Sequence, residues 1–85
     1  MSAFNIINDD WTDYETRKPK ATERHFVNCE DSWELYYLIK KIRRYHPYLS
    51  TDELKVAIME SCRQISKPRP RVLFIQAVLR KFGII

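Results

Sequence analysis

The pattern of apolar and polar positions between residues 31 and 45 is the clearest helix signal in the chain. The segment reads DSWELYYLIKKIRRY. At about 100° per residue, its aliphatic side chains fall in one stripe, as in an amphipathic helix that faces a core. Asp31 and Glu34 have capping-box spacing, cations occupy the last turns, and Pro47 follows, so the end signals agree with the period. The predicted core stripe is Leu35, Leu38, Ile39 and Ile42.

Two further helices are predicted downstream. Ser50 and Glu53 have the spacing of a second capping box, and a helix over 51–65 follows. A third helix, over 69–82, begins within SKPRPR and ends before Gly83, the single glycine, where a left-handed residue suits a helix end. The connections are short, so neighbouring helices pack as antiparallel or angled pairs. The predicted fold is all-α, a small three-helix domain with helices near 31–45, 51–65 and 69–82.

Residues 1–28 show no helical period and form an N-terminal arm in this prediction. The arm is expected to be irregular, and short strands at 4–7 and 25–28 could pair with each other. A purely solvated tail rarely carries so many large apolar side chains, so part of the arm is expected to dock on the helical domain. These side chains are Phe4, Ile6, Ile7, Trp11, Tyr14, Phe26 and Val27.

Charge divides the chain at nearly the same place. The formal net charge is +4. Residues 1–30 hold six acids and four bases, whereas residues 31–85 hold five acids and eleven bases. An acidic, aromatic arm (1–28) therefore precedes a basic three-helix domain (29–85), and a basic domain favours an anionic partner.

Basic residues around the start of the third helix are the first candidate nucleic-acid contacts. Cations at a helix N-terminus do not help that helix to form, so contact with phosphate is one use for them. In a helix-turn-helix arrangement this end would meet DNA. Pro68 and Pro70 count against the idea, because they remove backbone N–H groups that would cradle a phosphate. The candidate contacts are Lys67, Arg69, Arg71, Gln76 and Arg80.

The face of the first helix opposite its core stripe combines rings with cations. Such a face can stack the bases of a single strand and hold its backbone. The acidic arm complements this face in both charge and apolar content, so we favour coverage by the arm, within one chain or between two chains. Asp9, Asp10 or Asp13 would then pair with Lys40 or Arg44. This aromatic-basic face consists of Trp33, Tyr36, Tyr37, Lys40 and Arg44.

Catalysis and metal binding have little support in the sequence. There is no glycine-rich phosphate loop, no H-E-x-x-H and no G-x-S-x-G, so we expect no enzyme, no cofactor and no small-molecule substrate. A zinc site would need His25, Cys29, His46 and Cys62 together, yet only one pair of these is closely spaced. We therefore expect no metal site.

The start of the chain is acidic, and no apolar run is long enough to cross a bilayer. These features predict a cytoplasmic protein without membrane association. In that compartment Cys29 and Cys62 would be reduced thiols, although nothing in the sequence rules out a disulfide between them.

Two classes of function stay open. The preferred one is a small non-enzymatic binding or regulatory domain, with nucleic acid as its partner through the basic helical part. The alternative is a protein-interaction or homodimerisation module in which the basic charge is incidental. The alternative depends on the acidic-aromatic stretch DDWTDYE and on Val56 and Met59, which face outward on the second helix.

Overall fold

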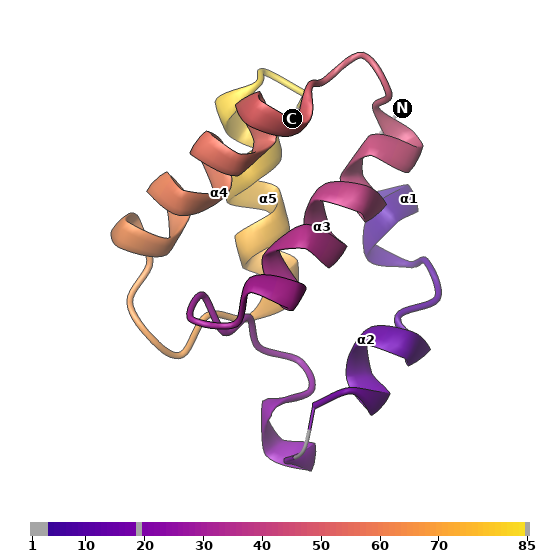
Figure 1. Cartoon of the computed structure of the whole chain (residues 1–85), viewed down its shortest axis with the longest axis vertical. Coiled ribbons are helices and arrows are strands. Elements are labelled where there is room, and N and C mark those ends of the chain that lie inside the picture. The colour runs from indigo at the N-terminus through magenta and orange to yellow at the C-terminus, as the bar shows by residue number, and fades with distance from the viewer. Residues whose placement is uncertain (1–3, 19, 85) are drawn as a thin grey trace.

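Three long helices follow one another through the C-terminal part of the chain (Figure 1). The computed structural model describes residues 4–18 and 20–84. The long helices are α3 (Ser32–Tyr45), α4 (Thr51–Gln64) and α5 (Arg71–Lys81), preceded by the short α1 (Phe4–Ile7) and α2 (Thr12–Thr16) and the 3₁₀ turn η1 (Ala21–Glu23). The described residues contain no strand, only an isolated bridge between Phe26 and Pro70. The predicted all-α fold with a partly docked arm is confirmed.

Two of the three predicted helix caps are present in the structure. Ser50 and Glu53 form the predicted capping box at α4, with both reciprocal bonds present. Gly83 ends α5 with a φ of 72°, and Ile84 donates back to the carbonyl of Leu79, as in a Schellman motif. The capping box predicted at Asp31 is wrong, because the Asp31 side chain makes no cap hydrogen bond.

Two stretches of the arm, Phe4–Ile7 and Thr12–Thr16, are helical, so the prediction of a strand at 4–7 is wrong. Residues 25–28 pair instead with the connection between α4 and α5. The amide of Val27 donates to the carbonyl of Arg69, and the amide of Arg71 donates to the carbonyl of His25, each at 2.8 Å. A lone hairpin is marginal in water, whereas this pairing ties the arm to a segment that the helices already hold.

The core lies between α3, α4 and α5 and extends to the arm. α1 lies beside α3 (Figure 1). The predicted core stripe of α3 is buried except for Leu35, which is half-buried. Cys62, Ile65 and Phe82 are also half-buried against the core. Phe74 of α5 is fully buried. The main buried side chains are Ile6, Trp11, Tyr14, Leu38, Ile42, Leu54, Ile58, Phe74, Ile75, Val78 and Leu79. No helix among the described residues is long and apolar enough to span a bilayer.

His46 follows the last residue of α3 and is buried, with its Nδ1 3.3 Å from the Tyr48 hydroxyl. Burial lowers the pKa of His46 below its ordinary value of 6.5. The unfolded chain therefore binds a proton near pH 6.5 that the folded chain does not bind. Stability contributed by the neutral ring is complete above that pH and is lost as the pH falls through the lower folded-state pKa.

We expect the melting temperature of the wild-type protein to fall more steeply than that of His46→Gln between about pH 7.5 and pH 5. The glutamine variant lacks the titrating ring, so its decline reports the other titratable groups of the chain. Thermal melts followed by circular dichroism at several pH values measure the difference. Parallel declines in the two proteins would show that His46 does not contribute.

Candidate functional site

Arg69, a candidate phosphate contact, is engaged inside the molecule. Its Nε donates to the carbonyl of Ile65 at 2.7 Å, and its Nη2 donates to the carbonyl of Cys62 at 3.0 Å. These carbonyls belong to the last turn and the C-cap of α4, where backbone oxygens have no intrahelical partner. Arg69 therefore caps the C-terminal end of α4.

Arg71 is also engaged, and it is buried. Its Nη2 lies 3.2 Å from Glu15 Oε2, its Nη1 donates to the carbonyl of Arg24, and its guanidinium carbon lies 4.5 Å from the centre of the Trp11 ring. All three partners come from the arm. Arg71, the first residue of α5, thus attaches the arm to the helical domain, a role that was not predicted from the sequence.

The other three candidates, Lys67, Gln76 and Arg80, differ in exposure and in partners. Lys67 is exposed, and its Nζ lies 3.0 Å from Glu30 Oε1. Gln76 is half-buried, and Arg80 is exposed near the far end of α5. Because Arg69 and Arg71 bind groups within the chain, the helix-turn-helix hypothesis loses two of its candidate phosphate contacts.

The aromatic-basic face of α3, by contrast, borders an open groove of about 740 Å³. The arm covers it only in part. The Tyr14 ring lies 5.6 Å from that of Trp33, and the Trp11 ring lies 5.9 Å from that of Tyr37. Tyr36 stays 57% exposed. The groove is lined by Asp13, Arg17, Trp33, Tyr36, Tyr37, Lys40, Lys41 and Arg44.

The acidic residues of the arm contact Lys41, which was not among the cations predicted to pair with them. Lys41 is buried, donates to the carbonyl of Asp10 at 2.7 Å and lies 3.8 Å from Asp9 Oδ2. The prediction that Lys40 or Arg44 pairs with the arm is therefore wrong, and both stay exposed. A hydrogen bond from the Tyr45 hydroxyl is the main cause of a lowered pKa at Asp9. The anionic form of Asp9 is thus favoured beside Lys41.

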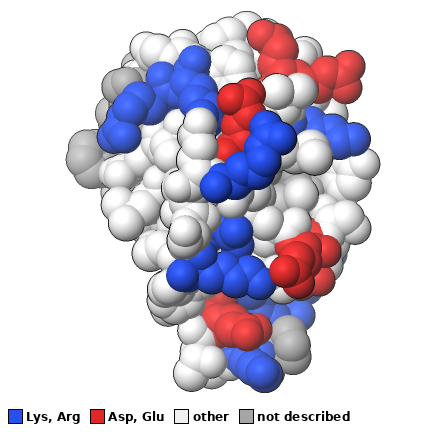
Figure 2. Space-filling view, turned by 90° about the vertical axis from the view of Figure 1, so that its left-hand side faces the viewer, with Lys and Arg blue, Asp and Glu red and all other residues white. Residues whose placement is uncertain are grey.

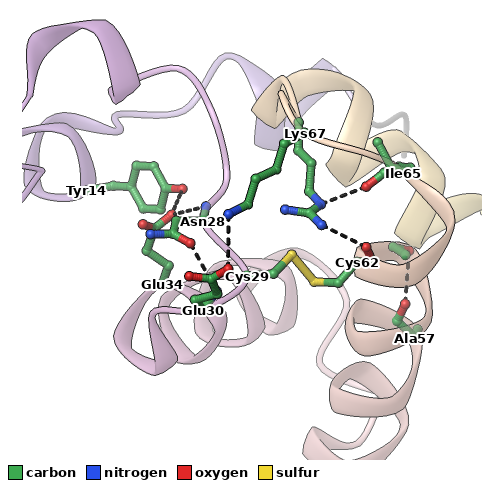
Figure 3. The surroundings of a disulfide bond; sticks show 11 residues. Tyr14, Asn28, Cys29, Glu30, Glu34, Ala57, Cys62, Ile65 and Lys67 are labelled. Atoms are coloured by element: carbon green, nitrogen blue, oxygen red, sulfur yellow. Dashed lines mark hydrogen bonds and ion pairs between the residues drawn. A yellow bond between two sulfur atoms is a disulfide. The ribbon is translucent and has the colours of Figure 1, made fainter.

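A buried ion pair, which the sequence pattern did not predict, joins the arm to α3. Glu34 Oε1 lies 3.0 Å from Lys18 Nζ and accepts from the amide of Asn28 at 3.0 Å. The same oxygen accepts from the Tyr14 hydroxyl, and burial together with this bond raises the pKa of Tyr14. Figure 3 shows Tyr14 and Asn28 directed at Glu34. Lys18 also donates to the carbonyl of Phe26.

This cluster has the residue types of an active site but not the access. The side chains of Lys18 and Glu34 are 3% and 0% exposed, so a substrate could not reach the carboxylate. The cluster holds the arm and the start of α3 together. One signal could have revealed it, because Glu34 and Lys41 share a helical stripe with Leu38, beside the aliphatic core stripe.

Cys29 and Cys62 form a disulfide, with their Cα atoms 6.1 Å apart (Figure 3). The prediction of reduced thiols is therefore wrong. The bond links the loop before α3 to the last turn of α4, two places that the sequence separates by 33 residues. Proximity of the two thiols depends on how α3 and α4 pack, which is why spacing along the chain did not reveal it.

The disulfide also removes Cys29 and Cys62 from the four-ligand zinc arrangement considered above. His25 lies beside Glu15 and His46 beside Tyr48. Within 4–18 and 20–84, no three His, Cys, Asp or Glu residues are grouped so as to hold a metal ion. Structural disulfides are typical of oxidising compartments, so the Cys29–Cys62 bond does not agree with the expectation of a cytoplasmic protein.

Comparison of the chain with protein-family models, curated proteins and solved structures finds no match. The class of this protein is therefore defined by its fold and by the groove beside α3. The protein is a small all-α domain whose N-terminal arm is docked and whose aromatic-basic groove is partly open.

Proposed function

We propose that the protein is a non-enzymatic binding domain that holds single-stranded nucleic acid in the groove beside α3. The observation that carries the proposal is the mixture of side chains lining this groove, three aromatic rings with four cations and one acid. Stacking on rings and contact of cations with phosphates are the two interactions that bind single strands without sequence preference.

The exposed residues that line the groove fall into two groups, rings that can stack on bases and cations that can contact phosphates. Tyr36 offers a largely exposed ring, and Trp33 and Tyr37 offer partly exposed ones. Lys40 and Arg44, one turn apart on α3, are exposed, and no ion pair within the described part of the chain involves them. Their charge is therefore available to a strand that follows the groove.

Arg17 extends the basic border onto the arm. Its guanidinium carbon lies 5.5 Å from the centre of the Trp33 ring, and its side chain is exposed. A base stacked on Tyr36 would place its phosphates within the reach of cations on both sides of the groove. This arrangement supports a single strand over a duplex, because a duplex keeps its bases inside.

Binding of a fluorescein-labelled deoxythymidine or uridine oligonucleotide of about twelve residues tests the proposal by fluorescence anisotropy. We expect micromolar affinity at about 50 mM salt and a log–log salt slope near −2 if about three phosphates are contacted. Unlabelled single strand should compete better than the matched duplex. Undetectable binding at this salt concentration would reject nucleic acid as the partner.

Variants locate the contact surface. Tyr36→Ala should weaken binding about tenfold through the loss of a stacked base, whereas Tyr48→Ala, at a 70% exposed ring outside the groove, should leave it unchanged. Lys40→Gln with Arg44→Gln should make the salt slope shallower by about 1.4. Loss of binding in Arg80→Gln but not in the Lys40/Arg44 double variant would show that the nucleic acid contacts α5 and not the groove beside α3.

A further inference from the structure

Asp13 is the one acid among the described residues that line the groove beside α3, where the other lining residues are rings and cations. It lies in the first turn of α2, and its side chain is exposed. Its backbone carbonyl accepts from the Thr16 hydroxyl, but none of the ion pairs within 4–18 and 20–84 involves its carboxylate. The charge of Asp13 is therefore available to a ligand in the groove.

The requirements of α2 give only a small local reason for this acid. Arg17 follows Asp13 by about one turn and is its natural partner within the segment, yet the Arg17 guanidinium carbon lies 5.5 Å from the centre of the Trp33 ring and forms no ion pair with Asp13. An acid in a first turn also suits the helix dipole. However, α2 has five residues, and Glu15 provides a second acid in the same turn.

Asp13 lies beside the rings on which a base would stack. The groove has two walls, with Asp13 and Arg17 on the side of α2 and the rings on α3. The pKa of the Tyr37 hydroxyl is raised mainly by burial, and the negative charge of Asp13 raises it further, so the carboxylate is close to Tyr37. A base stacked on a ring turns its edge to the side chains around that ring. Asp13 is therefore placed to meet the edge of a bound base.

The chemistry of a carboxylate selects among the ligands that could meet it. A carboxylate accepts hydrogen bonds and donates none, and it repels phosphate. The four cations in the same groove disfavour a cationic ligand. An uncharged donor remains, and the hydrogen-bonding edges of unpaired bases carry such donors.

The four bases differ in the donors that they offer to a carboxylate. Guanine presents N1–H and its 2-amino group side by side, which matches the two oxygens of one carboxylate. Adenine and cytosine present one amino group beside a ring nitrogen that accepts. Uracil and thymine present a single N–H between two carbonyl oxygens, which a carboxylate repels. A carboxylate at the base edge therefore favours guanine most and uracil or thymine least.

We propose that Asp13 gives the groove a preference for guanine over uracil and thymine, by accepting hydrogen bonds from N1–H and the 2-amino group of a base stacked on α3. This inference rests on the proposed function and specifies the class of single strand, one that contains guanine. The rings and cations hold any strand, and Asp13 distinguishes among the bases.

Two fluorescein-labelled RNA strands of about twelve residues test the proposal by fluorescence anisotropy at about 50 mM salt. One is uridine throughout, and the other has a pair of guanosines at its centre. We expect the wild-type protein to bind the guanosine strand about five- to tenfold more tightly, as for a two-bond contact with a base edge. Replacing these guanosines by inosine removes only the 2-amino groups and should abolish most of the preference.

Asp13→Asn should change the two affinities in opposite directions. The variant should bind the guanosine strand more weakly than the wild-type protein does, because one of the two acceptors is replaced by a donor. It should bind the uridine strand at least as tightly, because a charge that repels phosphate is gone. The preference should fall to about twofold or less. A general disturbance of the groove would weaken the binding of both strands.

Asp52→Asn is the matched control. Asp52 is an exposed acid that follows the first residue of α4, as Asp13 follows the first residue of α2, and it does not line the groove. α4 lies at the left edge of the molecule in Figure 1, and Figure 2 looks onto that side, where acids and bases are interspersed. Asp52→Asn should keep the preference of the wild-type protein. Circular dichroism of both variants, with wild-type helicity expected, ensures that folded chains are compared.

The possible failures are distinguishable. Equal binding of the uridine, inosine and guanosine strands by the wild-type protein would overturn the role of Asp13 and leave the proposed function standing. A guanosine preference that Asp13→Asn retains, or that Asp52→Asn loses as well, would also overturn it. Undetectable binding of all three strands would reject the base preference together with nucleic-acid binding.

Discussion

Replacing Glu34 by alanine is expected to destabilise the protein by about 3–5 kcal/mol, the usual loss when one partner of a buried ion pair is removed. The Lys18 ammonium, with a side chain 3% exposed, would then lie in the interior without its counter-charge. The amide of Asn28 would lose its acceptor as well. The melting temperature should fall by about 15–30 °C. Urea unfolding followed by circular dichroism and by the fluorescence of Trp11, which is buried, measures the change.

Glu30 provides a matched control for this substitution. Its carboxylate also lies 3.0 Å from a lysine, but the side chains of Lys67 and Glu30 are 58% and 77% exposed. Glu30→Ala should therefore cost about 1 kcal/mol or less, because water replaces the partner. Equal losses of stability in Glu30→Ala and Glu34→Ala would mean that water reaches the Lys18–Glu34 pair in solution.

A double substitution separates the cost of an unpaired charge from the loss of packing. Lys18→Met combined with Glu34→Leu removes both charges and keeps most of the side-chain volume. We expect this variant to be more stable than Glu34→Ala, since apolar replacements of a buried pair are often neutral. A double variant as unstable as Glu34→Ala would show that the bonds to Tyr14 and Asn28 matter more than the charge on Lys18.

Breaking the Cys29–Cys62 bond is the second change with a large expected effect. The bond closes a loop with a separation of 33 residues, so the chain-entropy model gives a loss of about 3–4 kcal/mol. Thermal melts of the wild-type protein with and without dithiothreitol measure the effect, and a decrease of about 15 °C or more is expected on reduction. An intact bond also makes the oxidised chain two mass units lighter than the reduced one.

The variant in which both cysteines are replaced by serine is the control. It should melt near the temperature of the reduced wild-type protein and should not respond to dithiothreitol. The pair Lys67–Glu30, which spans the same gap between the loop before α3 and the connection after α4, is too exposed to replace the bond. Two titratable thiols in the purified, unreduced protein would contradict the disulfide.

The sequence by itself determined the long helices, because their determinants are local. Apolar spacing predicted the core stripe of α3, and the capping box of Ser50 with Glu53 predicted the start of α4. Gly83 marked the end of α5 through its left-handed backbone. Each of these signals acts within about one or two turns of the chain, so a reading of neighbouring residues finds them.

The candidate site was predicted only in part. The rings and cations of the aromatic-basic face were identified from the period of α3, and the groove beside it is lined by all five of them. The contribution of Arg17 and the choice of Lys41 over Lys40 as the partner of the arm were not identified. Both depend on the path of the arm, which has no period from which to derive its position.

Only the tertiary structure decided which polar groups face inward and which meet. Glu34 looked like a capping residue and Arg71 like a phosphate contact, yet both bind the arm. The two cysteines looked separate and are bonded. A charge is buried only where a partner from elsewhere in the chain offsets its desolvation, and that partner is set by packing. Local pattern therefore determined the helices, and long-range packing decided which residues remain at the surface for function.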